Sequence, residues 1–339
     1  MPPRTRRIAG FLAIAIGTVP APLDSAVNIA FPAIVAAFGL AVEDIRWVVI
    51  SYVLTHSSLM LVFGKLGDIL GYRLIFATGL AVSAAAFTAC SLATTLGFLL
   101  AGRVLQGIGI ALILSCGPAL ATSLVDERQR TRALGIYAAI MAVGQGLGPL
   151  IGGFLVDIFG WSVVYWARVP LCLAGLALSV ALPAGTPGAG GMRGFDGIGA
   201  ILLVTGLSSM MLTAAGHSTP LGLSLQGIMA VLAATAFALF IARSRKHESP
   251  IIRLSTFADG RFLSMNLTSI AVNFAAFSIM LLVPFWLART AGLDAKTGGI
   301  ILALAPIGTV IGASTASRIV ERMGSGWLAI AGMVLSVAG

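Results

Sequence analysis

The stretch "GKLGDILGYR", residues 64–73, places three glycines and three charged side chains between two long apolar runs. Elsewhere charge is scarce, because the 339-residue chain is 58% hydrophobic and only 10% charged. A soluble domain is typically about 45–50% apolar and about 25% charged. Short charged connections between apolar runs are typical of an all-α polytopic membrane protein, in which about 20 apolar residues form each spanning helix. A membrane β-barrel would show short alternating segments instead.

Apolar runs of membrane-crossing length recur along the whole chain. They predict ten spans, at about residues 9–38, 47–69, 74–94, 97–123, 132–157, 162–183, 197–216, 222–242, 261–288 and 298–318. A further run opens at Trp327 and stops with the sequence at Gly339. Because a helix cannot end halfway through lipid, we expect the sequence to be a fragment whose C-terminal part is missing.

Basic residues lie mainly on one side of these expected spans. If the N-terminus is cytoplasmic, 16 of the 21 Lys and Arg residues fall on inner segments. The exceptions are Arg46, Arg289 and Lys296 outside, and Arg103 and Arg168 within spans. This asymmetry follows the positive-inside rule and predicts a multi-pass protein of the cytoplasmic membrane with its N-terminus inside. Basic loops that face anionic lipid explain the net charge of +9 without a nucleic-acid partner.

Two long linkers divide the chain. Residues 184–196 are rich in Gly and Pro, and residues 243–261 are basic and polar. The two spans between these linkers are nearly free of charge. We therefore expect an N-terminal six-helix bundle over 1–183, linkers with two inserted helices over 184–260, and the incomplete first part of a C-terminal bundle over 261–339.

The opening stretch resembles a signature of the major facilitator superfamily, G-x-L-x-D-x-x-G-x-R. The matching residues are Gly64, Leu66, Asp68, Gly71 and Arg73. Three further motifs make the chain similar to the fourteen-span drug:proton antiporters of that superfamily. The resemblance implies two six-helix bundles with an inserted helix pair. It also implies that the loop is a conformational latch for the outward-facing state, the alternative being a loop that only sets topology.

The second motif is "RVLQGIGIA", residues 103–111. It is similar to the superfamily pattern R-x-x-Q-G-x-G-x-A through Arg103, Gln106, Gly107, Gly109 and Ala111. An arginine within a span is costly and therefore marks a candidate functional site. By resemblance, Arg103 and Gln106 take part in proton coupling or substrate binding. The alternative is an arginine that extends to the outer interface.

The third motif is "GQGLGPLIGG", residues 144–153. It resembles the antiporter pattern G-x-x-x-G-P-x-x-G-G through Gly144, Gly148, Pro149, Gly152 and Gly153. Small residues at this spacing form a groove in which another helix packs closely, and a proline can kink a span. By resemblance this helix is a hinge for alternating access in exporters, the alternative being an ordinary packing interface.

The fourth motif is "LDSAVNIAFP", residues 23–32. It resembles the first-span motif of the fourteen-span exporters through Leu23, Asp24, Asn28, Ala30 and Pro32. A carboxylate within lipid is costly unless it is neutralised, so Asp24 is the candidate proton carrier, with Asn28 as an accompanying residue. The alternative is a structural ion pair between Asp24 and a buried arginine.

One departure from the family concerns "GWSVVYWARVP", residues 160–170, where Arg168 stands at a position that the family gives to asparagine. Arg168 is about 9 Å from the outer end of its span and Asp24 about 24 Å from the inner end of its own. Both therefore lie in the outer half of a core about 30 Å thick. We hypothesise that Arg168 is a counter-ion for Asp24 or for an anionic substrate, which argues against assuming a cationic cargo.

The sequence lacks the motifs GxxxxGK[ST], HExxH and GxSxG, and its three cysteines form no CxxC pair. We therefore expect no catalytic residues, no metal and no cofactor other than a proton gradient. The resemblance implies a monomeric secondary transporter that exports amphiphilic small molecules or drugs in exchange for protons. The alternatives are an exporter or facilitator of a specific metabolite, a multi-span enzyme or receptor, and a truncated inactive member of the family.

Overall fold

The computed structural model describes residues 3–184, 195–216 and 223–289, together with residues 308, 327 and 331–332. Within these residues the secondary structure is helical, without strands. Eight of the described segments are long and apolar enough to cross a membrane, and they coincide with the first eight expected spans. Apart from the isolated residues, the expected span at 298–318 and the run that begins at Trp327 lie outside the described part.

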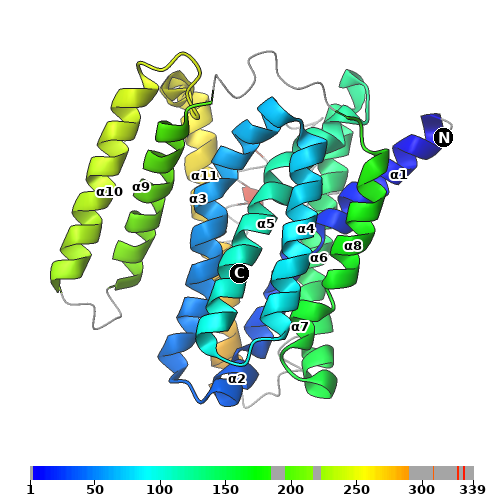
Figure 1. Cartoon of the computed structure of the whole chain (residues 1–339), viewed down its shortest axis with the longest axis vertical. Helices are drawn as coiled ribbons and strands as arrows, with labels where there is room; N and C mark the ends of the chain where they lie inside the picture. The colour runs from blue at the N-terminus through cyan, green and yellow to red at the C-terminus, as the bar shows by residue number, and fades with distance from the viewer. Residues whose placement is uncertain are drawn as a thin grey trace.

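Six spans form an N-terminal bundle (Figure 1). Its helices are α1 (Pro3–Thr18), α2 (Ser25–Phe38), α3 (Arg46–Leu70), α4 (Tyr72–Ser91), α5 (Leu96–Ser123), α6 (Arg130–Phe159), α7 (Val163–Trp166) and α8 (Val169–Leu178). Short 3₁₀ turns join or extend them: η1 (Pro22–Asp24), η2 (Val42–Ile45), η3 (Glu127–Gln129) and η4 (Ser179–Ala181).

Two of these spans are broken helices, although the apolar pattern predicted one uninterrupted run for each. The first span divides into α1 and α2, with η1 between them, and the sixth divides into α7 and α8. Pro20 and Pro22 lie in the first break, where their missing N–H groups interrupt the helical hydrogen-bond ladder. Irregular backbone within a membrane bundle is stable only where protein groups satisfy its carbonyls. The breaks are therefore places where polar side chains are needed.

The core lies where α4 and α5 cross closely. Phe76, Leu80 and Phe87 of α4 are fully buried there. A Cβ atom added to Gly109 of α5 would lie 2.8 Å from the backbone nitrogen of Ser83, so only glycine permits this approach. Such small-residue contacts drive helix association in lipid, where the hydrophobic effect between helices is weak.

The inserted pair is made of α9 (Gly197–Gly216) and α10 (Leu223–Ser244), which pack against each other beside α3 (Figure 1). Asp196, which is buried, receives a hydrogen bond of 2.5 Å from Nε of Arg243 and one of 2.9 Å from the backbone N–H of Gly199. Burial alone raises the pKa of Asp196, but these hydrogen bonds hold it below its ordinary value. The pair therefore carries its own ion pair at one end.

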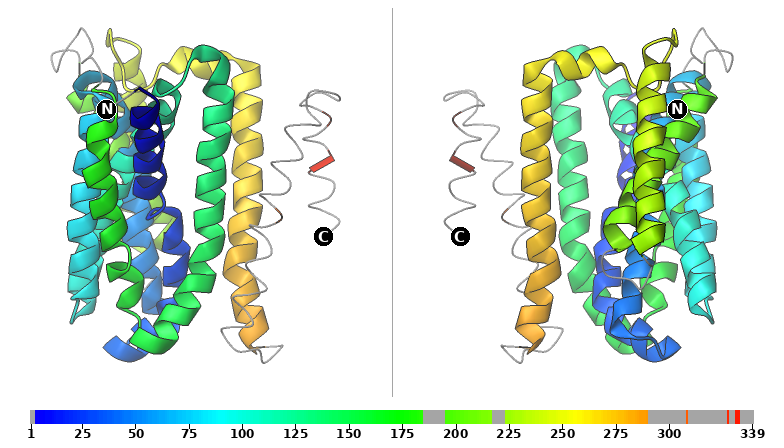
Figure 2. Two further views of the ribbon diagram at one scale, coloured as in Figure 1. Left: turned by 90° about the vertical axis from the view of Figure 1, so that its right-hand side faces the viewer. Right: turned by 90° about the vertical axis from the view of Figure 1, so that its left-hand side faces the viewer.

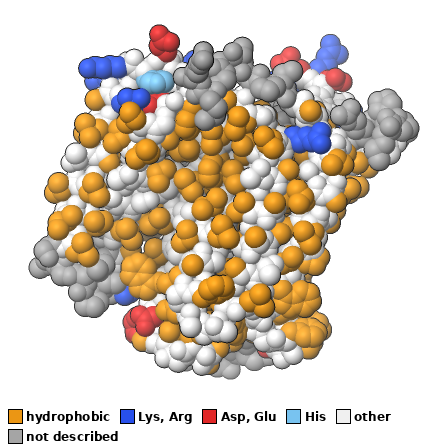
Figure 3. Space-filling view, viewed as in Figure 1, with side chains coloured by type: hydrophobic (Ala, Val, Ile, Leu, Met, Phe, Trp, Pro, Cys, Tyr) orange, Lys and Arg blue, Asp and Glu red, His pale blue; other side chains and the backbone are white. Residues whose placement is uncertain are grey.

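The last described helix, α11 (Gly260–Arg289), follows the turn η6 (Leu254–Ala258) and covers the ninth expected span. It runs roughly parallel to the bundle helices (Figure 2). On the face shown in Figure 3, hydrophobic side chains cover most of the surface along the helices, whereas Lys, Arg, Asp and Glu gather near the two ends. Large hydrophobic side chains such as Phe154, Ile201 and Val231 are exposed, which suits the spans to contact with lipid.

Candidate transport site

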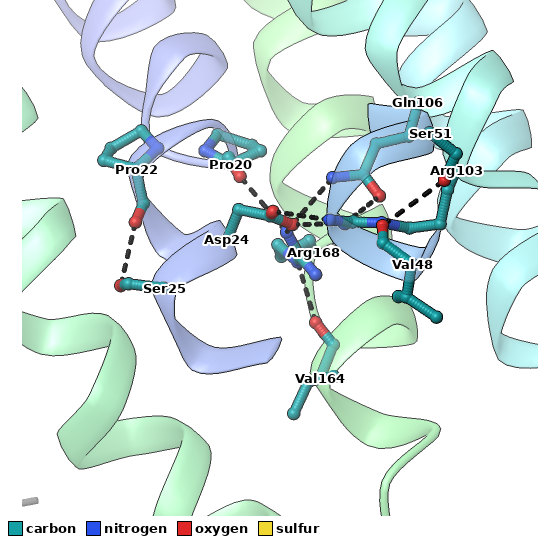
Figure 4. Close-up of polar contacts among 10 residues, drawn as sticks. All are labelled: Pro20, Pro22, Asp24, Ser25, Val48, Ser51, Arg103, Gln106, Val164 and Arg168. Carbon is teal, nitrogen blue, oxygen red and sulfur yellow. Dashed lines mark hydrogen bonds and ion pairs between the residues drawn. The ribbon is translucent and has the colours of Figure 1, made fainter. Parts of the chain in front are cut away.

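Asp24 lies at the break in the first span, near the middle of the segment Arg7–Phe38. It precedes the first turn of α2, yet its carboxylate makes no capping hydrogen bond to that helix. The side chain points instead towards the interior of the bundle, where it meets residues from α5 and from the break in the sixth span (Figure 4). The break thus frees Asp24 to serve as the centre of a polar cluster.

Arg103 of α5 holds the carboxylate of Asp24 with two hydrogen bonds. Its Nη1 donates to Oδ1 at 2.7 Å and its Nη2 donates to Oδ2 at 3.0 Å, a bidentate pairing. Gln106, one turn along α5, donates from Nε2 to Oδ1 at 2.8 Å and accepts from Nη1 of Arg103 at 2.8 Å. The remaining Nε of Arg103 donates to the carbonyl of Val48 at 2.9 Å. Cζ of Arg103 also lies 4.5 Å from the ring centroid of Tyr52.

Arg168 approaches the same carboxylate from the break between α7 and α8. Its Nη1 donates to Oδ1 of Asp24 at 2.9 Å, and its Nε donates to the carbonyl of Val164 at 2.7 Å. Cζ of Arg168 lies 4.4 Å from the ring centroid of Phe87 and 5.4 Å from that of Tyr165. The guanidinium is therefore held between one carboxylate and two aromatic rings.

The cluster contains two positive charges and one negative charge. The side chains of Arg103 and Arg168 are 2% and 3% exposed, whereas that of Asp24 is 14% exposed. Burying charges is costly unless hydrogen bonds replace their hydration. Four donors satisfy the carboxylate here, so loss of its charge would leave two buried arginines without their common partner.

The glycine-rich face of α6 packs on the break that carries Asp24. Cβ atoms added to Gly144, Gly148 and Gly152 would overlap Pro22, Ser25 and Ala26, respectively. Oγ of Ser25 lies within hydrogen-bonding distance of the carbonyl of Gln145, at 3.0 Å.

The other two residues of this motif differ in their surroundings. Pro149 is buried within α6, whereas a Cβ on Gly153 would meet only Ile29, at 4.0 Å. The helix predicted as a hinge therefore lies directly against the candidate proton carrier's span.

The residues of the predicted latch lie at and beside the turn between α3 and α4, with Gly64 and Asp68 near the end of α3, Gly71 in the turn and Arg73 at the start of α4. Gly71 has a φ of 94°, which favours glycine. Asp68 accepts a hydrogen bond from the hydroxyl of Tyr72, and Nη1 of Arg73 lies 3.5 Å from the carbonyl of Leu182. A Cβ on Gly64 would have only Ser115 near it, at 4.0 Å. Within the described residues Asp68 forms no ion pair with an arginine, so the latch stays a prediction.

Asn28 does not belong to the cluster, since its side chain is exposed on α2 one turn beyond Asp24. No sequence motif indicated that Tyr52, Phe87 and Tyr165 would lie against the two arginines. Pro20 and Pro22 were the available sign of the break in the first span. In the described part of the chain, no group of three or more His, Cys, Asp or Glu side chains could hold a metal ion.

The comparisons with known proteins agree with this architecture. Residues 9–339 match the family model of the Major Facilitator Superfamily, so the chain belongs to that family. A methylenomycin A resistance protein of Bacillus subtilis (strain 168) is 31% identical over 334 residues, which is 97% of this chain and 71% of the relative. The riboflavin transporter RibZ of Clostridioides difficile (strain 630) is 28% identical, over 92% of this chain and 68% of its own length.

Among solved structures, the proton:xylose symporter XylE resembles the chain with a TM-score of 0.62 at 12% identity. That likeness covers 94% of this chain and 70% of the XylE chain, and at this identity it speaks for the fold alone. The family consists of transporters, so the chain is a multi-pass membrane transporter and not an enzyme. Such transporters use ion gradients and generally need no cofactor.

Proposed function

We propose that this transporter exports amphiphilic small molecules across the cytoplasmic membrane in exchange for protons. The observation that carries the proposal is Asp24, a carboxylate in the middle of a membrane span that is bound by Arg103, Gln106 and Arg168. An ionisable group at this depth is a candidate proton carrier because burying it without a function is costly. The drug-resistance name of the Bacillus subtilis relative supports export as the direction.

In this proposal Asp24 alternates between an ionised state held by the arginines and a protonated state. A proton that binds to the carboxylate removes its charge and weakens the bidentate pairing with Arg103. Because Asp24 lies where α1 and α2 separate, release of this pairing lets α2 change its angle to α1. In this exchange, proton and substrate occupy the transporter in turn.

The movement of α2 reaches α6 through their direct contact. At Gly144 and Gly148 no side chain separates the backbone of α6 from Pro22 and Ser25. A shift of α2 therefore requires a matching shift of α6, which assigns the glycine motif to the conformational step rather than to ligand binding. The basic residues of the expected inner loops support a cytoplasmic N-terminus.

A second candidate is export or facilitated passage of one specific metabolite. The name of the relative from Clostridioides difficile, a riboflavin transporter, favours this alternative. The two candidates differ in selectivity, since a drug exporter accepts chemically diverse molecules and a metabolite carrier accepts one.

The test is transport of dyes into inverted membrane vesicles that contain the chain, with and without an imposed pH gradient. Ethidium, Nile red and 5-carboxyfluorescein provide a cationic, a neutral and an anionic probe. We expect gradient-dependent uptake of at least one dye, its loss in Asp24→Asn, and its retention in the control Asp157→Asn, whose side chain is exposed near the end of α6. Uptake that ignores the gradient, uptake that survives Asp24→Asn, or no uptake of any dye would contradict the proposal.

A further inference from the structure

We propose that Arg168 forms a subsite for an anionic group and that the substrates are therefore amphiphiles bearing a carboxylate. This inference rests on the proposed function, because it specifies the cargo of the same site. Its starting point is charge balance: two guanidinium groups and one carboxylate leave the described cluster with one positive charge in excess. An excess charge inside a membrane-spanning bundle is costly, and a bound anion removes that cost.

The two arginines are not equivalent partners of Asp24. All three nitrogens of Arg103 donate hydrogen bonds, to Asp24, Gln106 and the carbonyl of Val48. In contrast, Nη2 of Arg168 is buried and has no hydrogen-bond partner among the described residues. Buried guanidinium N–H groups are nearly always satisfied in native proteins. The free donor on Arg168 therefore identifies the part of the cluster that is ready to receive a ligand.

The surroundings hold Arg168 in a fixed orientation. Its Nε is bound to the carbonyl of Val164, and its plane is flanked by Phe87 and Tyr165. A planar guanidinium whose orientation is fixed binds a carboxylate with little further loss of conformational entropy. The hydroxyl of Tyr165 is also buried, and no group in the described part of the chain forms a hydrogen bond with it. The free donor thus lies in a rigid environment that already contains an aromatic platform.

The exposed fractions of the three charged side chains indicate the direction from which a ligand reaches this subsite. The Asp24 side chain is more exposed than either arginine, so an incoming group meets the carboxylate before the guanidinium groups. A cationic group would be attracted by Asp24 but repelled by the two arginines behind it. A carboxylate that binds Arg168 instead neutralises the excess charge and leaves Asp24 paired with Arg103. The cluster therefore selects an anion over a cation of the same size.

Three matched probes test this selectivity on the purified whole chain in detergent: 1-naphthoate, 1-naphthamide and 1-naphthylmethylammonium. They share an aromatic body and carry a negative, a neutral and a positive group. Titration calorimetry at constant ionic strength is expected to give a Kd for 1-naphthoate at least about tenfold lower than that for the ammonium probe. Tighter binding of the ammonium probe, equal binding of the two, or no binding of 1-naphthoate would overturn the proposal.

Variants of Arg168 then connect the selectivity to the residue. Arg168→Asn is expected to weaken 1-naphthoate binding by at least about tenfold and to leave 1-naphthamide almost unchanged. Arg168→Lys keeps the positive charge but loses the planar guanidinium that can donate two parallel hydrogen bonds, so an intermediate affinity for 1-naphthoate is expected. The control Arg132→Asn, at an exposed position near the start of α6, should bind as the wild type does. An unchanged preference for 1-naphthoate in Arg168→Asn would refute the assignment.

If Arg168→Asn does not elute as a folded monodisperse protein, the wild-type comparison and Arg168→Lys still decide the outcome. The binding assay also separates this inference from the proposed function. If transport in vesicles does not depend on the pH gradient but 1-naphthoate still binds, the proposal of proton coupling is refuted and the anion subsite stands. If ethidium uptake depends on the pH gradient but 1-naphthoate does not bind, only the proposal of an anion subsite is refuted.

Discussion

Replacement of Gly148 by alanine is the sharpest test of the contact between α6 and the broken first span. A Cβ at this position would collide with Oγ of Ser25 and would lie 3.2 Å from both Cβ of Ser25 and the backbone nitrogen of Ala26. Oγ lies 3.0 Å from the carbonyl of Pro22 as well as 3.0 Å from that of Gln145, and it can rotate away only by giving up the contact with Gln145. The backbone nitrogen of Ala26 cannot move without shifting α2, so we expect Gly148→Ala to strain the packing at Asp24.

Opposing effects set the magnitude of this change. Overpacking of a close contact costs about 1–3 kcal/mol, and loss of the Ser25 hydrogen bond costs about 0.5–1.5 kcal/mol. Alanine favours the helix over glycine by about 1 kcal/mol. We therefore expect a net loss of about 1–3 kcal/mol in the free energy of unfolding of Gly148→Ala. The control Gly135→Ala, on the same helix with nothing within 4 Å of its added Cβ, should gain up to about 1 kcal/mol.

Thermal unfolding in detergent, followed by circular dichroism, measures the difference, and dye uptake into vesicles measures its effect on transport. The unfolding midpoint should fall in Gly148→Ala and should stay level or rise in Gly135→Ala. Adding Ser25→Ala to Gly148→Ala removes the colliding oxygen, so the double variant should recover part of the loss. Equal midpoints for Gly148→Ala and Gly135→Ala, or a double variant no better than Gly148→Ala, would refute the packing described here.

Three further changes test other parts of the molecule. Arg103→Lys loses the bidentate pairing with Asp24, so dye uptake should fall and the free energy of unfolding should drop by about 1–3 kcal/mol, as read from transport and thermal midpoints. Gly109→Ala should destabilise the chain by about 1–3 kcal/mol in the same melts, because its Cβ would meet backbone atoms of Ser83. Asp196→Asn should lower the midpoint at pH 7, where the ionised carboxylate stabilises the fold. Since folding lowers the pKa of Asp196 below its ordinary 3.8, this stabilisation is lost as the pH falls through the folded value, and the wild-type and Asp196→Asn midpoints should converge below about pH 4. A gap that persists in acid would contradict the ion pair with Arg243.

Much of the fold could be predicted because lipid imposes simple rules on sequence. The lengths and separations of the apolar runs predicted the described spans, and the charged stretch at 64–73 with the glycine motif at 144–153 indicated the family. The breaks in the first and sixth spans were missed because hydropathy averages over the few irregular residues around Pro22 and Arg168. A window of about 19 residues cannot register a one-turn interruption.

The sequence identified Asp24, Arg103, Gln106 and Arg168 as candidate site residues, but it did not predict how their side chains contact one another. Depth along the spans suggested that Asp24 and Arg168 lie at similar levels, and the structure brings them within 2.9 Å. The shared pairing of one carboxylate with two arginines could not be inferred, because it depends on how the half-helices turn at each break. Nor could the sequence indicate that the glycines of α6 face Ser25, since spacing reveals a groove but not its occupant.

The ion pair between Asp196 and Arg243 has a consequence for how the protein is made. Arg243 of α10 pairs with the buried carboxylate of Asp196, which directly precedes α9, and the two helices pack mainly on each other. Within the described residues they touch the bundle chiefly along α3. A helical hairpin that is internally neutral can leave the translocon as one finished unit, before or after its neighbours. Insertion or deletion of this helix pair would also leave unchanged the packing of the six-span bundle that contains Asp24.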